Sequence, residues 1–234
     1  MIAQLKNIVQ STLHLFYPHN CTGCGSDLLP PGNQLCLTCI HQLPHTHFAG
    51  IPNNPVEKYF WGRIPLVAAY SQFYFSKEFL IQRLIHELKY RDNTDIGFYL
   101  GEMMGTTLLK CDRFKDLDAL VPLPLYPDKE HKRGYNQATV ICNGVAAVMN
   151  IPVLNGAVIR KLATETQTRK HRTERWENVR SSFKVERENE LSGKHVLLVD
   201  DVVTTGATLE ACGSAMLQAT NCRLSIATLA YAPK

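Results

Sequence analysis

The sequence predicts an α/β protein with a mostly parallel sheet, helices on both faces of the sheet, and a small metal-binding element near its N-terminus. Three observations lead to this fold class. Strand and helix patterns alternate from Asp118 onward, a buried strand ends abruptly at two carboxylates, and two Cys-x-x-Cys pairs precede both features. Alternation of this kind is typical of parallel sheets whose connections are helices.

Composition agrees with a soluble globular chain. Hydrophobic residues make up 45% and charged residues 20% of the 234 positions, and no apolar run approaches the length of a transmembrane helix. The formal net charge of +4 permits attraction to polyanions without requiring it. The first 17 residues suit an amphipathic helix better than a signal sequence. We therefore expect a cytoplasmic protein with no membrane span.

Four clustered cysteines predict a structural zinc site. The two Cys-x-x-Cys pairs are separated by eleven residues that contain Gly and Pro, and such pairs aim two thiolates each at one ion. Four thiolates leave no open position, so the metal has a structural role. Paired disulfides or redox thiols are the alternatives. We predict one Zn²⁺ per chain, held by Cys21, Cys24, Cys36 and Cys39.

A domain boundary is expected near residue 60. Residues 50–62 are rich in Pro, Asn and Gly and predict a linker. The N-terminal helix and the zinc module then occupy residues 1–60, and a second domain occupies residues 61–234. Its first part is predicted to form a strand at 66–75 and helices at 77–90 and 97–110.

The core of the second domain is expected from residue 116 to the end. Its predicted strands are 119–125, 158–161, 195–199 and 224–231, and its predicted helices are 136–149 and 207–220. Four apolar residues from Val196 to Val199 indicate a strand that is buried on both faces.

The segment that follows this strand predicts a ligand site. Asp200 and Asp201 come directly before a small, hydroxyl-rich turn, at the strand end where α/β sheets bind ligands. Gly206 allows close backbone approach, and the free amides of a helix N-terminus bind phosphate. The two carboxylates suit the hydroxyls of a ribose diol, with a divalent cation to offset charge. The sequence thus indicates a ribose 5-phosphate ligand. The alternative is an ordinary strand, turn and helix whose carboxylates are solvated or cap the helix.

The stretch Leu198 to Thr208 resembles the phosphoribosyl pyrophosphate (PRPP) motif of type I phosphoribosyltransferases. The resemblance implies that Asp200 and Asp201 hold the ribose hydroxyls and Mg²⁺. It also implies a 5′-phosphate loop made of Val203, Thr204, Thr205, Gly206, Ala207 and Thr208.

Two basic segments are candidates for pyrophosphate binding. In the resembled enzymes the loop after the first core strand holds pyrophosphate through backbone amides. Here Pro122, Pro124 and Pro127 have no amide to offer. The charge is then expected from Lys129, Lys132 and Arg133, which form the predicted pyrophosphate loop together with Gly134, unless the loop is only a solvated basic turn.

The second segment, residues 160–182, predicts a mobile lid. It holds seven Lys or Arg against three Glu and is long for an inert loop. A solvated surface helix over residues 173–180 is the alternative. The expected lid residues are Arg169, Lys170, Arg172 and Arg175.

Taken together, these parts resemble the ComF family of competence-associated, type I phosphoribosyltransferase-like proteins. The resemblance covers nearly the whole chain in a shared order. It rests on Phe16–Pro18, the Cys pairs, Leu88–Tyr90, Val121–Pro124, Arg133–Gln137, Thr166–Gln167, Glu174–Val179 and the PRPP motif. It implies an N-terminal zinc element on a phosphoribosyltransferase core, with residues 61–115 as the hood that recognises the acceptor. It also implies a role in handling incoming single-stranded DNA.

Two functions follow as expectations. The first is a Mg²⁺-dependent protein that binds PRPP, or another ribose 5-phosphate ligand, and transfers the phosphoribosyl group. The second is a single-stranded DNA-binding competence factor that works with DNA-uptake proteins and whose PRPP site is regulatory or vestigial. The acceptor is not readable from the sequence, and a homo-oligomer is left open.

Overall fold

The computed structural model describes residues 20–27, 29, 32–76, 80–161 and 182–233. The chain forms two compact units, Met1–Leu43 and Pro44–Lys234. The division lies ahead of the expected boundary at residue 60. No helix among the described residues combines the length and the apolar character that crossing a bilayer requires.

The larger unit is built on a four-stranded sheet in which every pairing is parallel. The strands are β1 (Ala68–Tyr74), β2 (Ala119–Pro122), β5 (His195–Val203) and β6 (Arg223–Tyr231). They lie in the order β1-β6-β5-β2. β5 is interior because it pairs with β2 on one side and β6 on the other. The carboxyl ends of all four strands therefore share one edge, which confirms the predicted fold class.

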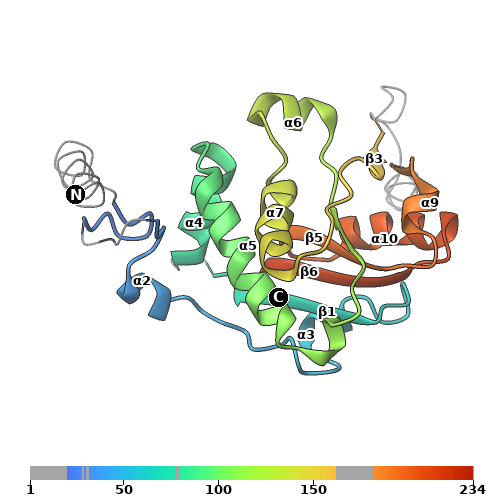
Figure 1. Cartoon of the computed structure of the whole chain (residues 1–234), viewed down its shortest axis with the longest axis horizontal. Coiled ribbons are helices and arrows are strands. Elements are labelled where there is room, and N and C mark those ends of the chain that lie inside the picture. Colours follow the sequence, from blue (N-terminus) through green and yellow to red (C-terminus); the bar gives the residue numbers. More distant parts are fainter. Residues whose placement is uncertain (1–19, 28, 30–31, 77–79, 162–181, 234) are drawn as a thin grey trace, which may run out of the picture. The chain divides into compact units, whose positions relative to one another are not determined.

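Helices flank the sheet as predicted (Figure 1). They are α4 (Leu80–Tyr90), α5 (Thr94–Leu109), α7 (Gln137–Met149) and α10 (Ala207–Ala219). α5 and α7 pack tightly against each other, and α7 also contacts β5 and β2. α10 follows β5 directly and packs against β5 and β6. Short helical turns complete the unit at η1 (Asp112–Phe114) and α9 (Glu188–Leu191).

One predicted strand of the parallel sheet belongs elsewhere, and this is a correction. β3 (Val158–Arg160) pairs antiparallel with β4 (Phe183–Val185) in a separate two-stranded sheet. β3 is only three residues long and exposes Ile159, so it lacks the continuous apolar run of a strand buried on both faces. The two strands frame residues 162–181, which lie outside the described residues.

The expected linker at 50–62 is also corrected, because it folds into the larger unit. It contains α3 (Pro55–Lys58), and Val56 and Phe60 are almost completely buried. The Asn54 side chain accepts hydrogen bonds from the amides of Val56 and Glu57 and so caps the helix. The Glu57 carboxylate lies 2.6 Å from the Arg113 guanidinium. The Pro and Asn content thus serves capping and turns rather than a free linker.

The predicted strand 119–125 ends early, at Pro122, and the basic loop after it contains a helix. α6 (Pro127–Arg133) begins with Pro127 at its first position, which suits a residue without an amide hydrogen. It ends at Gly134, whose φ of 84° is left-handed. No residue of α6 is buried. Pro127 and Gly134 are start and stop signals of a helix, but without an apolar face between them they suit a turn equally well.

Candidate functional site

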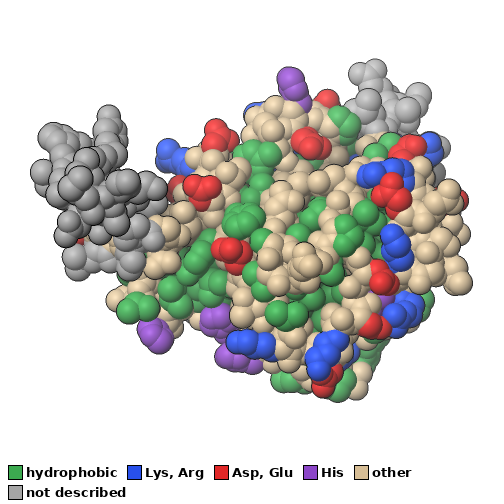
Figure 2. Space-filling view, in the orientation of Figure 1, with side chains coloured by type: hydrophobic (Ala, Val, Ile, Leu, Met, Phe, Trp, Pro, Cys, Tyr) green, Lys and Arg blue, Asp and Glu red, His purple; other side chains and the backbone are tan. Residues whose placement is uncertain are grey.

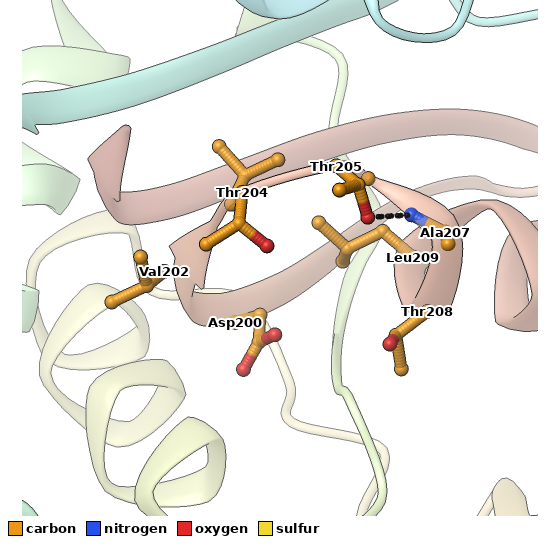
Figure 3. Close-up of a pocket in the computed structure, with 9 residues that line it drawn as sticks. Asp200, Val202, Thr204, Thr205, Ala207, Thr208 and Leu209 are labelled. Carbon is orange, nitrogen blue, oxygen red and sulfur yellow. Dashed lines mark hydrogen bonds between the residues drawn. The ribbon is translucent and has the colours of Figure 1, made fainter. Parts of the chain in front are cut away.

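The PRPP-like motif forms an open pocket at the carboxyl edge of the sheet (Figure 3). The pocket is small and open to solvent. β5 delivers Asp200 at one side, and the turn from Thr204 to Gly206 connects β5 to α10 at the other. All six residues of the predicted 5′-phosphate loop line it: Val203, Thr204, Thr205, Gly206, Ala207 and Thr208.

Gly206 allows the turn to take its shape. Its φ is 75°, a left-handed conformation that strains other residues, and it forms the N-cap of α10. A Cβ at this position would lie 3.0 Å from Cε1 of Phe60. The Thr205 hydroxyl accepts a hydrogen bond from the Ala207 amide at 3.4 Å. The first amides of the 13-residue helix α10 therefore face an open pocket, which is the arrangement that binds phosphate.

The two aspartates of the motif have different surroundings. Successive side chains of a strand point to opposite faces, and only Asp200 lines the pocket. Asp201 is buried, and its Oδ2 lies 2.6 Å from Nζ of Lys89 at the end of α4. The Asp200 carboxylate accepts a hydrogen bond from the Asp201 amide at 2.8 Å. The Asp200 carboxylate thus faces the pocket, whereas the Asp201 carboxylate forms an ion pair with Lys89.

Burial raises the pKa of Asp200, and the adjacent negative charge of Asp201 raises it further. The amide of Asp201 and the positive charges of Lys89 and Arg160 act in the opposite direction without cancelling these effects. A carboxyl group in this state favours the arrival of a cation or hydroxyl donors, because either one stabilises its ionised form.

Arg160 is a second cation near the acid pair. Its guanidinium lies over the ring of Tyr126, 3.8 Å from the centroid, and 5.1 Å from the centroid of Phe183. Its Nε is buried and has no hydrogen-bond partner among the described residues. Arg160 is the last residue of β3 and lies shortly before the segment 162–181 in the sequence. Its positive charge lowers the pKa of Asp200.

The predicted pyrophosphate residues do not gather at the pocket. Lys129 and Lys132 are exposed on α6, and Gly134 caps that helix. Arg133 donates a hydrogen bond to the Gln137 side chain and lies over the ring of Tyr90, 5.7 Å from its centroid. None of these four residues lines the pocket of Asp200.

The four residues of the predicted lid, Arg169, Lys170, Arg172 and Arg175, lie outside the described residues. The strands β3 and β4, which precede and follow this segment, pair with each other.

The four clustered cysteines meet in the smaller unit. All four Sγ atoms lie within 4.8 Å of one another, and those of Cys24 and Cys36 are 3.7 Å apart. Zinc bound to four thiolates at about 2.3 Å in a tetrahedron separates the sulfurs by roughly 3.8 Å. The Cys36 amide donates to Sγ of Cys21, and this bond with other backbone amides outweighs burial and lowers the pKa of Cys21. The donor set therefore fits a structural zinc ion.

Sequence reasoning missed Lys89 and Arg160 as parts of this site. In the sequence, Lys89 fits the cationic end of a helix, and Arg160 fits the end of a sheet strand. Each reaches the acid pair through a tertiary contact that no local pattern encodes. The only sequence signal was the place of Lys89 in the short motif Leu88–Tyr90.

Known proteins share the site-bearing part of the chain. The family described as "Phosphoribosyl transferase domain" matches residues 135–234. Competence protein F of Haemophilus influenzae is 27% identical over 210 residues, which is 83% of this chain and 89% of the relative. DNA utilization protein YhgH of Escherichia coli is 30% identical over 152 residues, 64% of this chain and 63% of the relative's length.

Two further proteins are similar to the chain. Competence protein ComFC of Bacillus subtilis is 24% identical over 203 residues, 82% of this chain and 81% of the relative. Glutamine PRPP amidotransferase of B. subtilis has a solved structure that is 17% identical with a TM-score of 0.44. The alignment covers 61% of this chain and 30% of that one. The matched domain and the names of the curated relatives confirm the resemblance of the chain to the ComF family of phosphoribosyltransferase-like proteins.

Proposed function

We propose that this chain binds PRPP together with Mg²⁺ and transfers its phosphoribosyl group as part of competence-linked DNA handling. The pocket formed by Asp200 and the loop 203–208 is the observation that carries the proposal. It offers a carboxylate for the ribose diol and helix amides for the 5′-phosphate, at the two sides of one cavity.

The transfer needs positioning more than a protein nucleophile. The bond between ribose C1 and a pyrophosphate oxygen breaks, both bonding electrons leave with pyrophosphate, and a nucleophilic atom of the acceptor bonds to C1. In this proposal Asp200 orients the ribose, and Arg160, whose charge acts on Asp200, counters the negative charge that develops on the leaving group. Bound Mg²⁺ supplies further positive charge, and Asp200 is the carboxylate available to hold it.

Calorimetric titration with PRPP and Mg²⁺ tests the binding step. The wild-type protein should bind, and Asp200→Asn should lose most of the affinity, because an amide neither carries charge nor holds a cation as a carboxylate does. Asp112→Asn is the matched control, since Asp112 is exposed and paired with Lys115 at a distance from the pocket. Equal affinity of wild type and Asp200→Asn would refute the assignment of Asp200.

Release of pyrophosphate tests the transfer step. We expect PRPP, Mg²⁺ and one member of a panel of nucleobases and nucleic acids to release pyrophosphate, with Arg160→Gln slower than wild type. Lys184→Gln on the neighbouring strand β4 is the control because Lys184 is exposed and pairs with Glu186. PRPP binding without release from any panel member would leave a PRPP-binding protein and contradict the enzymatic part of the proposal.

A second function, binding of single-stranded DNA, is favoured by one surface feature. Tyr90 is 66% exposed, lies 4.9 Å from the His86 ring between ring centroids, and faces the Arg133 guanidinium. Exposed aromatic rings beside cations stack nucleobases. Figure 2 shows acidic and basic side chains interspersed on the face in view, so charge alone does not mark a nucleic-acid track there.

This second function predicts a salt-dependent interaction with single-stranded oligonucleotides. Tyr90→Ala should weaken binding by about 1–3 kcal/mol, the usual contribution of a stacked base. Trp61→Ala is the control because Trp61 is also an exposed aromatic residue, but one that lies over Lys58 instead. An affinity that does not change with salt concentration would count against this second function. Equal losses of affinity in Tyr90→Ala and Trp61→Ala would count against Tyr90 as the residue that stacks on a base.

A further inference from the structure

The ion pair between Lys89 and Asp201 joins a helix end to the carboxyl edge of the sheet. The two side chains are 23% and 5% exposed, and Nζ of Lys89 lies 2.6 Å from Oδ2 of Asp201. A charge so poorly solvated is costly without its partner. The pair is therefore a fixed part of the site rather than a fluctuating surface contact.

The residues on both sides of Lys89 are held in place. The Tyr135 hydroxyl donates a hydrogen bond to the carbonyl oxygen of Leu88, and Arg133 lies over the ring of Tyr90. Asn136 then donates to the carbonyl oxygen of Leu123 at 3.0 Å, which ties the same turn to the segment directly after β2. The turn 133–137, which contains the Arg-Gly-Tyr-Asn-Gln motif, thus fixes the end of α4 over the sheet edge.

The Lys89–Asp201 ion pair reduces the electrostatic repulsion between the proposed ligand and the acid pair. A ribose phosphate brings negative charge to a pocket that already has two adjacent carboxylates, and like charges within several ångströms repel strongly at a protein's effective dielectric. Lys89 pairs with Asp201 and offsets its charge, and Asp200 is the carboxylate of the pair that lines the pocket.

We propose, resting on the proposed PRPP function, that Lys89 is a positioning residue that holds and neutralises Asp201, and that the turn 133–137 keeps Lys89 in place. Lys89 acts through Asp201 rather than by contact with the ligand. The motif Leu88–Tyr90 and the motif Arg133–Gln137 then have one joint role, which is to set the charge of the acid pair.

Titration of PRPP with Mg²⁺ into four variants tests this role. Lys89→Met should weaken binding at least about tenfold, because it leaves an uncompensated charge beside the anion. Lys89→Arg should restore most of the affinity. The double variant Lys89→Met/Asp201→Asn should bind better than Lys89→Met alone, because a neutral amide at position 201 needs no cation. Arg83→Met, an exposed position on the same helix α4, should bind as wild type does.

The recovery in the double variant distinguishes a lysine that acts through Asp201 from a lysine with a different role. A lysine that contacts the ligand directly gives no recovery when Asp201 is also changed. If Lys89→Met fails to fold, the affinities of the double variant and of Tyr135→Phe still test the role of Lys89. Tyr135→Phe should fold and lose about two- to tenfold in affinity, the worth of one hydrogen bond.

The outcomes also separate this inference from the proposed function. No PRPP binding by the wild-type protein overturns the proposed function. PRPP binding by wild type that Asp200→Asn removes, with Lys89→Met unchanged or with no recovery in the double variant, overturns the role of Lys89 alone.

Discussion

At the scale of single residues, Asp200 lines the pocket in an environment that disfavours its ionised form. In the proposed function it meets a polar ligand, yet burial and the neighbouring Asp201 make its ionised form unfavourable in the ligand-free protein. Such a group is poised to change its protonation state when a ligand arrives. The proposed function therefore couples ligand binding to proton release at this residue.

We predict that PRPP and Mg²⁺ binding releases a proton from Asp200. The raised pKa means that Asp200 retains a proton at pH values where an exposed aspartate is ionised, and Mg²⁺ or a diol favours the ionised form. Affinity should therefore rise as pH increases through this raised pKa and fall as pH decreases. Calorimetry at neutral pH in buffers with different ionisation enthalpies measures the released protons. Identical heats in all buffers would contradict the prediction.

Gly206 is a second residue whose identity matters, because its backbone is left-handed and Phe60 lies close to it. We predict that Gly206→Ala destabilises the protein by about 1–2 kcal/mol from the left-handed backbone, with a further loss from the contact at 3.0 Å with Phe60. Gly193→Ala is the control, because Gly193 has a φ of 72° and no atom within 4 Å of an added Cβ. Urea denaturation of both variants isolates the Phe60 contribution. Equal losses would show that Phe60 simply moves aside.

At the scale of elements, the crossing of α5 and α7 depends on glycines. A Cβ on Gly144 would lie 2.1 Å from the carbonyl oxygen of Phe98, and one on Gly101 would lie 2.3 Å from the carbonyl oxygen of Ile141. Both obstacles are backbone atoms, so the helices would have to separate. Since α7 also packs on β2 and β5, this spacing fixes the layer beneath the ligand site.

Gly144→Ala should therefore cost about 3 kcal/mol or more, at the upper end for overpacked cores, although alanine is the better helix former. Gly213→Ala in α10 is the matched control, because the nearest atoms there belong to the side chains of Leu224 and Ile64. These side chains can adjust, so Gly213→Ala should lose less. Chemical denaturation compares the two, and a Gly144→Ala protein as stable as wild type would disprove a close helix crossing.

The same elements show what the sequence could predict and what it could not. The periodicity of apolar residues located α5, α7, α10 and all four strands of the main sheet, because burial on one or both faces leaves a local pattern. It failed for β3, whose partner strand β4 follows a segment of about 20 residues, and for α3, whose capping chemistry resembles a linker. The acid pair and its loop carried a local signature. Lys89 and Arg160 did not, because their roles depend on contacts across the fold.

At the scale of the whole molecule, the two units differ in what stabilises them. The larger unit has a parallel sheet with helices on it, whereas in the described part of the smaller unit the buried apolar residues are few. They are Cys21, Leu29, Leu35, Cys39 and Leu43. α2 (Leu37–His41), the one helix described there, has only five residues. So small a core needs an additional constraint such as a metal ion.

We predict that the purified protein carries one zinc ion and that a chelator unfolds the smaller unit selectively. Because metal binding supplies folding free energy to small tetrathiolate modules, removing zinc should abolish the amide exchange protection of residues 32–43. The amides of β5 should stay protected, since they are hydrogen-bonded within the parallel sheet. Cys36→Ser should reproduce the loss of zinc and of protection, while Cys222→Ser, at a cysteine outside the cluster, should retain zinc. Metal analysis and hydrogen exchange measure both quantities. Retained protection of residues 32–43 in zinc-free protein would mean that the four thiols only happen to lie close together.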